Sequence, residues 1–292
     1  MKSACDILIF GSMGDIAPLV AECLRGHGLK VDEMPFPQET LRDEAGYRRE
    51  LRKKLEGCAP RVIMPVGCQI AAARCRDIIP SGTILAAEDA GKIELLDSKT
   101  SCSRLAAGLG IPQPRIYSNA DEVEHYPVIF KKDGSFGGRG VRKPACREAL
   151  DNIIAHESTP YLIEEYVEGE DYSIDVLRCD GSMRYGCYRS LASTGLGPSS
   201  SRQMLDNDDP LSQEMVLHAE AILNEIGYQG ICGMDFRLDA RTGRLLFLEA
   251  NPRFTGGLAS QIDAGFELPF MLWKVCQDSP DTFSRCPSSK GL

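Results

Sequence analysis

Short apolar segments alternate with helical segments over residues 1–90, and this alternation restricts the folds open to the chain. Between the helical segments, strands are predicted at residues 7–10, 31–34, 62–66 and 83–87. Strands that alternate with helices favour a parallel sheet covered by helices. We therefore expect an α/β protein that begins with a Rossmann-like unit over residues 1–96.

The pattern changes after residue 97. A short strand at residues 128–132 leads into a glycine-rich loop, and antiparallel hairpins follow. The first hairpin turns through Asp180-Gly181, one of the strongest short hairpin signals, and a second is predicted over residues 231–250. We expect two further regions, a small lobe with a glycine-rich lid at residues 97–166 and a larger lobe at residues 167–292.

Composition excludes several classes of protein. Apolar residues make up 43% of the 292 residues and charged residues 26%, which excludes disordered and collagen-like chains. The net charge of −9 provides no basic field that would attract nucleic acid. Twelve cysteines occur without a CxxC pair, and the four histidines lack the spacing of zinc ligands. Because no apolar segment has the roughly 20 residues of a membrane helix, we expect a cytoplasmic protein with reduced thiols.

The second hairpin is predicted to bring two carboxylates face to face. If its turn is centred on Thr242, Asp235 lies opposite Glu249. Asn251 is two residues further on, so it joins the same face of the sheet. Carboxylate and amide oxygens suit Mg²⁺ shared with phosphate groups, so the sequence predicts a magnesium site. The alternative is that Arg237, on the same face, only neutralises the two acids.

A lysine near a strand end and a glycine-rich loop form a second pattern. Lys131 lies near the end of the predicted strand, and four glycines occupy seven positions from Gly134 to Gly140. Glycines let backbone N–H groups approach phosphate oxygens, which the lysine can also reach. The Gly-Lys-Ser/Thr ending of a Walker A loop is missing. A flexible connection between strands stays open as the alternative, as does a solvated position for Lys99.

The third pattern, at residues 161–173, is an apolar strand that becomes acidic and is followed by a glycine. Alone, this pattern is also typical of a sheet corner.

Taken in order, the three patterns resemble the ATP-grasp superfamily of carboxylate-amine ligases over about residues 1–275. The motifs are the lysine-bearing stretch before Gly-Ile-Pro-x-Pro, the lysine-glycine loop, Glu-Glu-Tyr-Val and Leu-Glu-Ala-Asn-Pro-Arg-Phe. They are most similar to the carbamoyl-phosphate-synthase-like branch, which includes amino-acid ligases such as the pyrrolysine-pathway lysine ligase.

This resemblance implies an ATP-grasp fold with a pre-ATP-grasp N-terminal domain, and a role for each matching residue. ATP phosphates would be bound by Lys99, Lys131 and the lid residues Gly134, Ser135, Gly137 and Gly138. Adenine and ribose would contact Glu164, Glu165, Val167 and Asp171, the last being shorter than the Glu usual in the family. Two Mg²⁺ ions, with Mn²⁺ as a substitute, would be held by Asp235, Glu249 and Asn251. Arg253 resembles the arginine that steadies the acyl-phosphate.

The resemblance implies an ATP-dependent ligase that activates a carboxylate, expected to be an amino acid, and joins it to an amine. Arg189 and Arg202 stand at the two ends of a long polar loop predicted for residues 190–209, and they are candidate substrate contacts or solvated loop residues. A nucleotide-binding regulatory protein without turnover is the alternative function. A nicotinamide-dependent enzyme is disfavoured because Gly11 and Gly14 leave the GxGxxG pattern incomplete. A homodimer is compatible with the resemblance.

Overall fold

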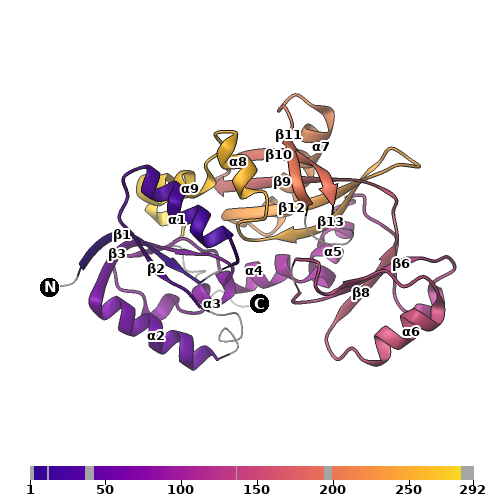
Figure 1. Ribbon diagram of the computed structural model, residues 1–292, viewed down its shortest axis with the longest axis horizontal. Helices are drawn as coiled ribbons and strands as arrows, with labels where there is room; N and C mark the ends of the chain where they lie inside the picture. The colour runs from indigo at the N-terminus through magenta and orange to yellow at the C-terminus, as the bar shows by residue number, and fades with distance from the viewer. Residues whose placement is uncertain (1–2, 12, 37–42, 136, 194–198, 284–292) are drawn as a thin grey trace.

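The computed structural model describes residues 3–11, 13–36, 43–135, 137–193 and 199–283. Within these residues the strands form three sheets. Figure 1 shows the parallel sheet at one end of the molecule, a small antiparallel sheet at the other end, and a five-stranded sheet between them. None of the described helices is long and apolar enough to cross a membrane.

The first sheet is parallel, with the strand order β2-β1-β3-β4, as the alternating pattern predicts. Its strands are β1 (Ser3–Phe10), β2 (Val31–Met34), β3 (Cys58–Pro65) and β4 (Ile84–Leu85). The helical segments are α1 (Ile16–Gly26), α2 (Glu44–Gly57), α3 (Gln69–Ala73) and the 3₁₀ turn η2 (Arg76–Ile78). Ile7, Leu8, Ile9 and Phe10 are all fully buried, because helices cover both faces of a parallel sheet.

Two consecutive helices connect the first sheet with the rest of the chain (Figure 1). The first, α4 (Ala90–Asp97), was not predicted; the second is α5 (Lys99–Gly108). Ser98 between them is extended, and its side chain accepts a hydrogen bond from the backbone N–H of Ser101, so it caps α5. The predicted boundary at residue 96 falls one residue before the end of α4; the three-domain division stays a prediction.

The small sheet has the strand order β5-β8-β6-β7. Its strands are β5 (Ile116–Tyr117), β6 (Val128–Lys132), β7 (Val141–Arg142) and β8 (Tyr161–Glu165). The turn η3 (Ala120–Glu122) and the helix α6 (Arg147–Ala155) complete this lobe. The core of this lobe contains Val128, Phe130, Leu150 and Ile163. The ends of β6 and β8 face the five-stranded sheet.

The five-stranded sheet is antiparallel, with the order β11-β10-β9-β12-β13. Its strands are β9 (Gly169–Cys179), β10 (Ser182–Ser193), β11 (Ser199–Met204), β12 (Gly230–Asp239) and β13 (Leu245–Asn251). The helical elements are α7 (Pro210–Glu225), α8 (Leu258–Asp263), α9 (Leu268–Asp278) and η4 (Pro280–Thr282). Both predicted hairpins, β9-β10 and β12-β13, are present.

The first unit and the C-terminal helices share one core. Side chains of α1 and the parallel sheet, such as Val20 and Met64, cluster with Leu268, Leu272 and Trp273 of α9. Figure 1 shows α1 beside α9 at the edge of the molecule, and the two helices are in contact. The parallel sheet is therefore anchored on the five-stranded lobe rather than joined to it only by α4.

One predicted element is wrong. The polar stretch at residues 190–209, expected as a loop, instead continues β10 to Ser193 and contains β11, which pairs with β10. Residues 194–198 lie outside the described part of the chain. The stretch lacks the β-branched residues that signal a strand, so the pairing comes from the neighbouring strand and not from local propensity.

Candidate active site

A cavity of about 400 Å³ lies between the small sheet and the five-stranded sheet. Its walls come from the α5 start, the lid, the facing ends of β6 and β8, and the strands β9 to β13. The predicted site residues that line it are Lys99, Lys131, Ser135, Gly137, Gly138, Glu164, Glu165, Val167, Asp171, Arg202, Asp235, Glu249, Asn251 and Arg253. Residues from six separate parts of the sequence therefore converge on one space.

Asp235 and Glu249 are paired residues on β12 and β13, as predicted. The pairing depends on a bulge, however, because Phe236 pairs with Phe247 and leaves Leu248 as an extra residue in β13. If the strands paired without a bulge, the register beside the turn would place Leu248 opposite Asp235, and Glu249 would lie on the other face. The predicted turn centre at Thr242 identifies the correct pair of acids. The residues beside the turn pair in a different register, however, and the bulge accounts for the difference.

The two carboxylates have different environments. Burial and the charge of Glu249 raise the pKa of Asp235 to about 7, while the Ser173 hydroxyl donates to its carboxylate at 2.6 Å. Burial also acts on Glu249, but Lys99, Lys131 and Arg253 outweigh it and lower its pKa. Asp235 is thus the acid of the pair that binds a proton more readily. Arg237 does not neutralise the pair, because its guanidinium lies 2.6 Å from the carboxylate of Asp171.

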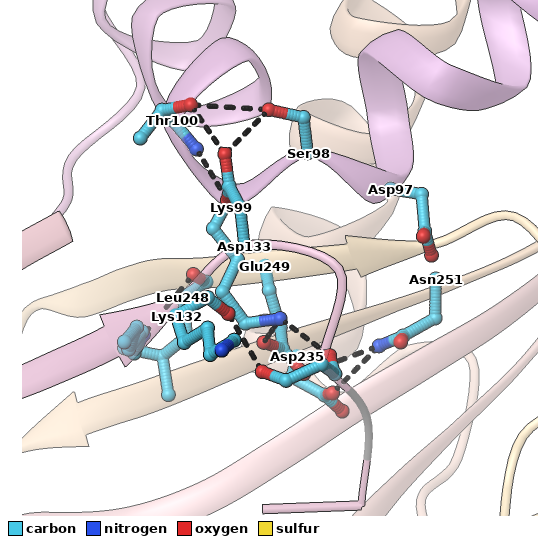
Figure 2. A network of polar contacts seen from close by, with 12 residues as sticks. Asp97, Ser98, Lys99, Thr100, Lys132, Asp133, Asp235, Leu248, Glu249 and Asn251 are labelled. Carbon is cyan, nitrogen blue, oxygen red and sulfur yellow. Dashed lines mark hydrogen bonds and ion pairs between the residues drawn. The ribbon is translucent and has the colours of Figure 1, made fainter. Parts of the chain in front are cut away.

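Asn251 connects the acids to Arg253. Its Nδ2 donates to Asp235 at 3.1 Å and to Glu249 at 3.5 Å, and its Oδ1 accepts from Arg253 at 2.5 Å. Arg253 also forms an ion pair with Asp97, at 2.6 Å, at the end of α4. Figure 2 shows Asp97 and Asn251 on the same side of this network. Asp97 therefore holds the arginine beside the acids.

Lys131 and Glu164 form a buried ion pair. The Lys131 Nζ lies 2.7 Å from the Glu164 carboxylate and donates to the backbone carbonyl of Leu248 at 3.3 Å. Burial raises the pKa of Glu164, although the Lys131 charge opposes this shift. The bulge that aligns the acids thus also offers Lys131 a backbone acceptor.

Lys99 and the lid are joined by backbone and side-chain contacts. The Lys99 Nζ donates to the Ser135 carbonyl at 2.9 Å and lies 3.6 Å from Glu249. Asp133, where β6 meets the lid, accepts from the hydroxyls of Ser98 at 3.0 Å and Thr100 at 2.7 Å (Figure 2). Asp133 therefore clamps the start of α5 to the base of the lid; Phe136 of the lid lies outside the described residues.

A second set of polar side chains, Arg202, Tyr188 and Thr255, also lines the cavity. The Arg202 guanidinium lies 5.6 Å from the centroid of the Tyr188 ring, and it forms no ion pair with an acid in the part of the chain that the structure describes. The buried Asp175 accepts hydrogen bonds from Tyr188 at 3.1 Å and from Thr255 at 2.8 Å, and also from Gln261. Burial raises the pKa of Asp175 to about 6. Asp175 thus orients side chains of this second set.

Comparison with known proteins identifies a family that part of the chain resembles. A family model described as "ATP-grasp in the biosynthetic pathway with Ter operon" matches residues 157–291. The matched residues, slightly less than half of the chain, resemble an ATP-grasp protein. It is 25% identical over 213 residues to the carbamoyl phosphate synthase large chain of Thermomicrobium roseum, a match covering 66% of this chain and 19% of that one.

Two further comparisons, one with a curated relative and one with a solved structure, agree with this resemblance. The D-alanine–D-alanine ligase of Fusobacterium nucleatum is 27% identical over 163 residues, which cover 52% of this chain and 55% of the ligase. The biotin carboxylase–β,γ-ATP complex of Campylobacter jejuni has a TM-score of 0.74 at 15% identity, covering 97% of this chain and 72% of that one. The curated relatives are thus matched over less than two thirds of their length, and the structural likeness confirms the predicted fold.

The residues present fit the magnesium expected of an ATP-grasp site. Asp235 lies opposite Glu249, whose charge raises the pKa of Asp235, and the Asn251 amide contacts both carboxylates. Hard oxygen donors around excess negative charge favour a divalent cation. The Asn251 amide would have to rotate to offer its oxygen, because its Nδ2 now faces the acids.

Some residues do not follow the prediction, and others were missed. Gly134 and Arg189 do not line the cavity; Arg189 instead pairs with Glu170. The missed polar residues around the ATP-grasp site are Asp97, Asp133, Ser173, Asp175 and Tyr188. Asp97 and Asp133 could have been found, because each lies within two residues of a predicted lysine. Asp175 and Tyr188 carry no local signal, since they meet only through strand pairing.

Proposed function

We propose that this protein is an ATP-dependent ligase that activates a carboxylate as an acyl-phosphate and joins it to an amine. The observation that carries the proposal is the convergence of three cations, Lys99, Lys131 and Arg253, with the acids Asp235 and Glu249 in one cavity. An anionic nucleophile can approach a phosphate only where positive charge offsets the repulsion. The match to D-alanine–D-alanine ligase supports an amino acid as the carboxylate.

In the proposed reaction, a carboxylate oxygen bonds to the γ-phosphorus of ATP, and the bond to the β-phosphate oxygen breaks with release of ADP. The amine then bonds to the acyl carbon, phosphate leaves, and the nitrogen loses a proton. Lys99 and Lys131 would hold the ATP phosphates, and Arg253 would face the transferred phosphoryl group. Mg²⁺ on Asp235, Glu249 and Asn251, as one or two ions or with Mn²⁺ in its place, would offset phosphate charge.

The remaining contacts are assigned by position. Glu164, Glu165, Val167 and Asp171 line the side of the cavity proposed for adenine and ribose. The lid residues Ser135, Gly137 and Gly138 would cover the phosphates and exclude water from the acyl-phosphate. Arg202, which lines the cavity, would contact an anionic group of a substrate. Arg189 lies outside the cavity lining and pairs with Glu170, so it is not proposed as a substrate contact.

The test is release of ADP and phosphate from Mg·ATP by the purified protein, screened against pools of amino acids and small carboxylates. Release that depends on a pool, with a product mass equal to two components minus water, would establish the ligase. ATP binding without turnover in every pool would favour the regulatory alternative, and absence of ATP binding would refute both. Light scattering of the same sample would test the predicted homodimer.

A further inference from the structure

A thiol, an imidazole and a carboxylate converge where α1 meets the beginning of α9. Cys23 and His27 are four residues apart at the end of α1, so they share one face. Glu267 immediately precedes α9. The Cys23 Sγ, a His27 ring nitrogen and a Glu267 oxygen all lie within 4.8 Å of one another, and His27 Nε2 is 3.0 Å from the carboxylate.

Neighbouring groups hold these side chains in place. The His27 ring stacks on Phe270, with ring centroids 3.6 Å apart and planes inclined by 2°. Burial and the charge of Glu267 raise the pKa of the Cys23 thiol to about 11, and a hydrogen bond with the backbone of Phe270 opposes this shift. Cys23 is buried and His27 is exposed, so a small ion can enter from solvent and meet a preformed sulfur ligand.

We propose that Cys23, His27 and Glu267 bind Zn²⁺ with water as the fourth ligand. Thiolate, imidazole and carboxylate are zinc ligands, and tetrahedral bond lengths of about 2.0–2.3 Å require donors about 3.3–3.6 Å apart. The three donors are therefore about one ångström from that geometry. Binding would release the thiol proton to solvent and replace the hydrogen bond between His27 and Glu267. The thiolate and carboxylate charges would together balance the ion.

A second group, Cys5, Asp32 and Cys58, is less suited to a cation. Its carboxylate already pairs with Lys54 at 2.8 Å, so one ligand is neutralised. In the α1–α9 group no lysine or arginine is within ion-pair distance of Glu267 among the described residues. This second group serves instead as the matched control.

The zinc site would join two walls of the proposed substrate cavity. The turn before α1 contributes Met13 to the cavity, and the segment before α8 and α9 contributes Thr255 and Gly256. An ion that ties α1 to α9 would stabilise both segments against movement. The inference does not depend on the ligase activity, because it concerns residues outside the cavity.

The experiment is a Co²⁺ titration of the full chain after treatment with a chelator, followed by displacement with Zn²⁺. Binding at Cys23 produces a thiolate-to-cobalt charge-transfer band, which an oxygen-ligand site at Asp235 and Glu249 cannot give. We expect His27→Gln and Glu267→Gln each to weaken binding at least tenfold, and Cys23→Ser to abolish the band. Cys58→Ser and His156→Gln should leave the spectrum unchanged.

Thermal unfolding provides a second readout. Zn²⁺ should raise the Tm of the wild-type chain and have little effect on His27→Gln, whose exposed side chain can be replaced without disturbing the core. If Cys23→Ser fails to fold, the His27 and Glu267 variants decide. The proposal is overturned if no charge-transfer band forms, if the band survives in the His27 variant, or if it disappears in Cys58→Ser.

Discussion

The Lys131 Nζ lies 2.7 Å from the Glu164 carboxylate, and the two residues are only 6% and 4% exposed. A buried pair of this kind contributes little net stability, but removing one partner leaves a charge that neither water nor a counter-ion can reach. Lys131 is at the same time the proposed phosphate ligand. A nucleotide phosphate would therefore compete with Glu164 for the ammonium, which couples occupancy of the site to the protonation of Glu164.

Replacing Lys131 with Met should reduce stability as well as activity. We expect a loss of about 3–5 kcal/mol in the free energy of unfolding at pH 8, because Glu164 is left unpaired. The loss should be smaller at pH 5, since the raised pKa of Glu164 lets the isolated carboxyl bind a proton. Urea unfolding of the purified variants measures this difference.

The neighbouring residue and a double variant provide the controls. Lys132→Ala removes a lysine from the same strand whose partner Glu157 is bound by Thr159 as well, so its effect should stay below about 1 kcal/mol. Lys131→Met with Glu164→Gln should recover most of the lost stability but no ATP turnover. Equal stability of Lys131→Met and wild type would contradict the buried pair.

Glu249→Gln should abolish turnover while leaving the hairpin folded. The amide keeps the size of the side chain but removes one of two opposed charges, and we expect metal affinity to fall by about 100-fold or more. Titration calorimetry with Mn²⁺ would show this. Glu165→Gln is the matched control, because Glu165 lines the same cavity but is not among the proposed metal ligands. Comparable metal loss in both variants would speak against the assignment.

Asp175 should make folding stability depend on pH. Its pKa is about 6 in the folded chain and near 4 when unfolded, so the folded state binds the proton more tightly. Stability linked to this group is present below pH 4 and is lost as the pH rises through 6, by up to about 3 kcal/mol. Asp175→Asn should lack this component. Urea midpoints of both proteins at pH 4, 6 and 8 test this prediction. Midpoints that change with pH in the same way for wild type and Asp175→Asn would contradict it.

Asp133→Ala should loosen the connection between the lid and α5. The variant loses the acceptor for Ser98 and Thr100, so we expect about 1–3 kcal/mol less stability and a higher KM for ATP. Asp133→Asn retains one acceptor oxygen and should give an intermediate effect. A KM unchanged in both variants would show that the clamp does not position Lys99.

Sequence patterns identified most of the residues that line the end of the cavity proposed for the nucleotide, because those residues stand in short motifs on a few strands. The acids were found through alternation along β12 and β13, and Lys131 through its place before the glycines. Where the contacts join distant segments, no pattern was available. His27 and Glu267 are 240 residues apart, and β11 is a strand only because β10 lies beside it.

The extra residue in β13 divides the hairpin into two registers, one beside the turn and one at the acids. Deletion of Leu248 would remove the bulge and pair Glu249 with Asp235 in an unbroken register, so the acids would stay opposed while Lys131 would lose the Leu248 carbonyl as an acceptor. Residues added at the exposed tip near Thr242 lie beyond the bulge and would leave the acids opposed. Tags or probes for this protein are therefore better placed in that turn than anywhere in β13.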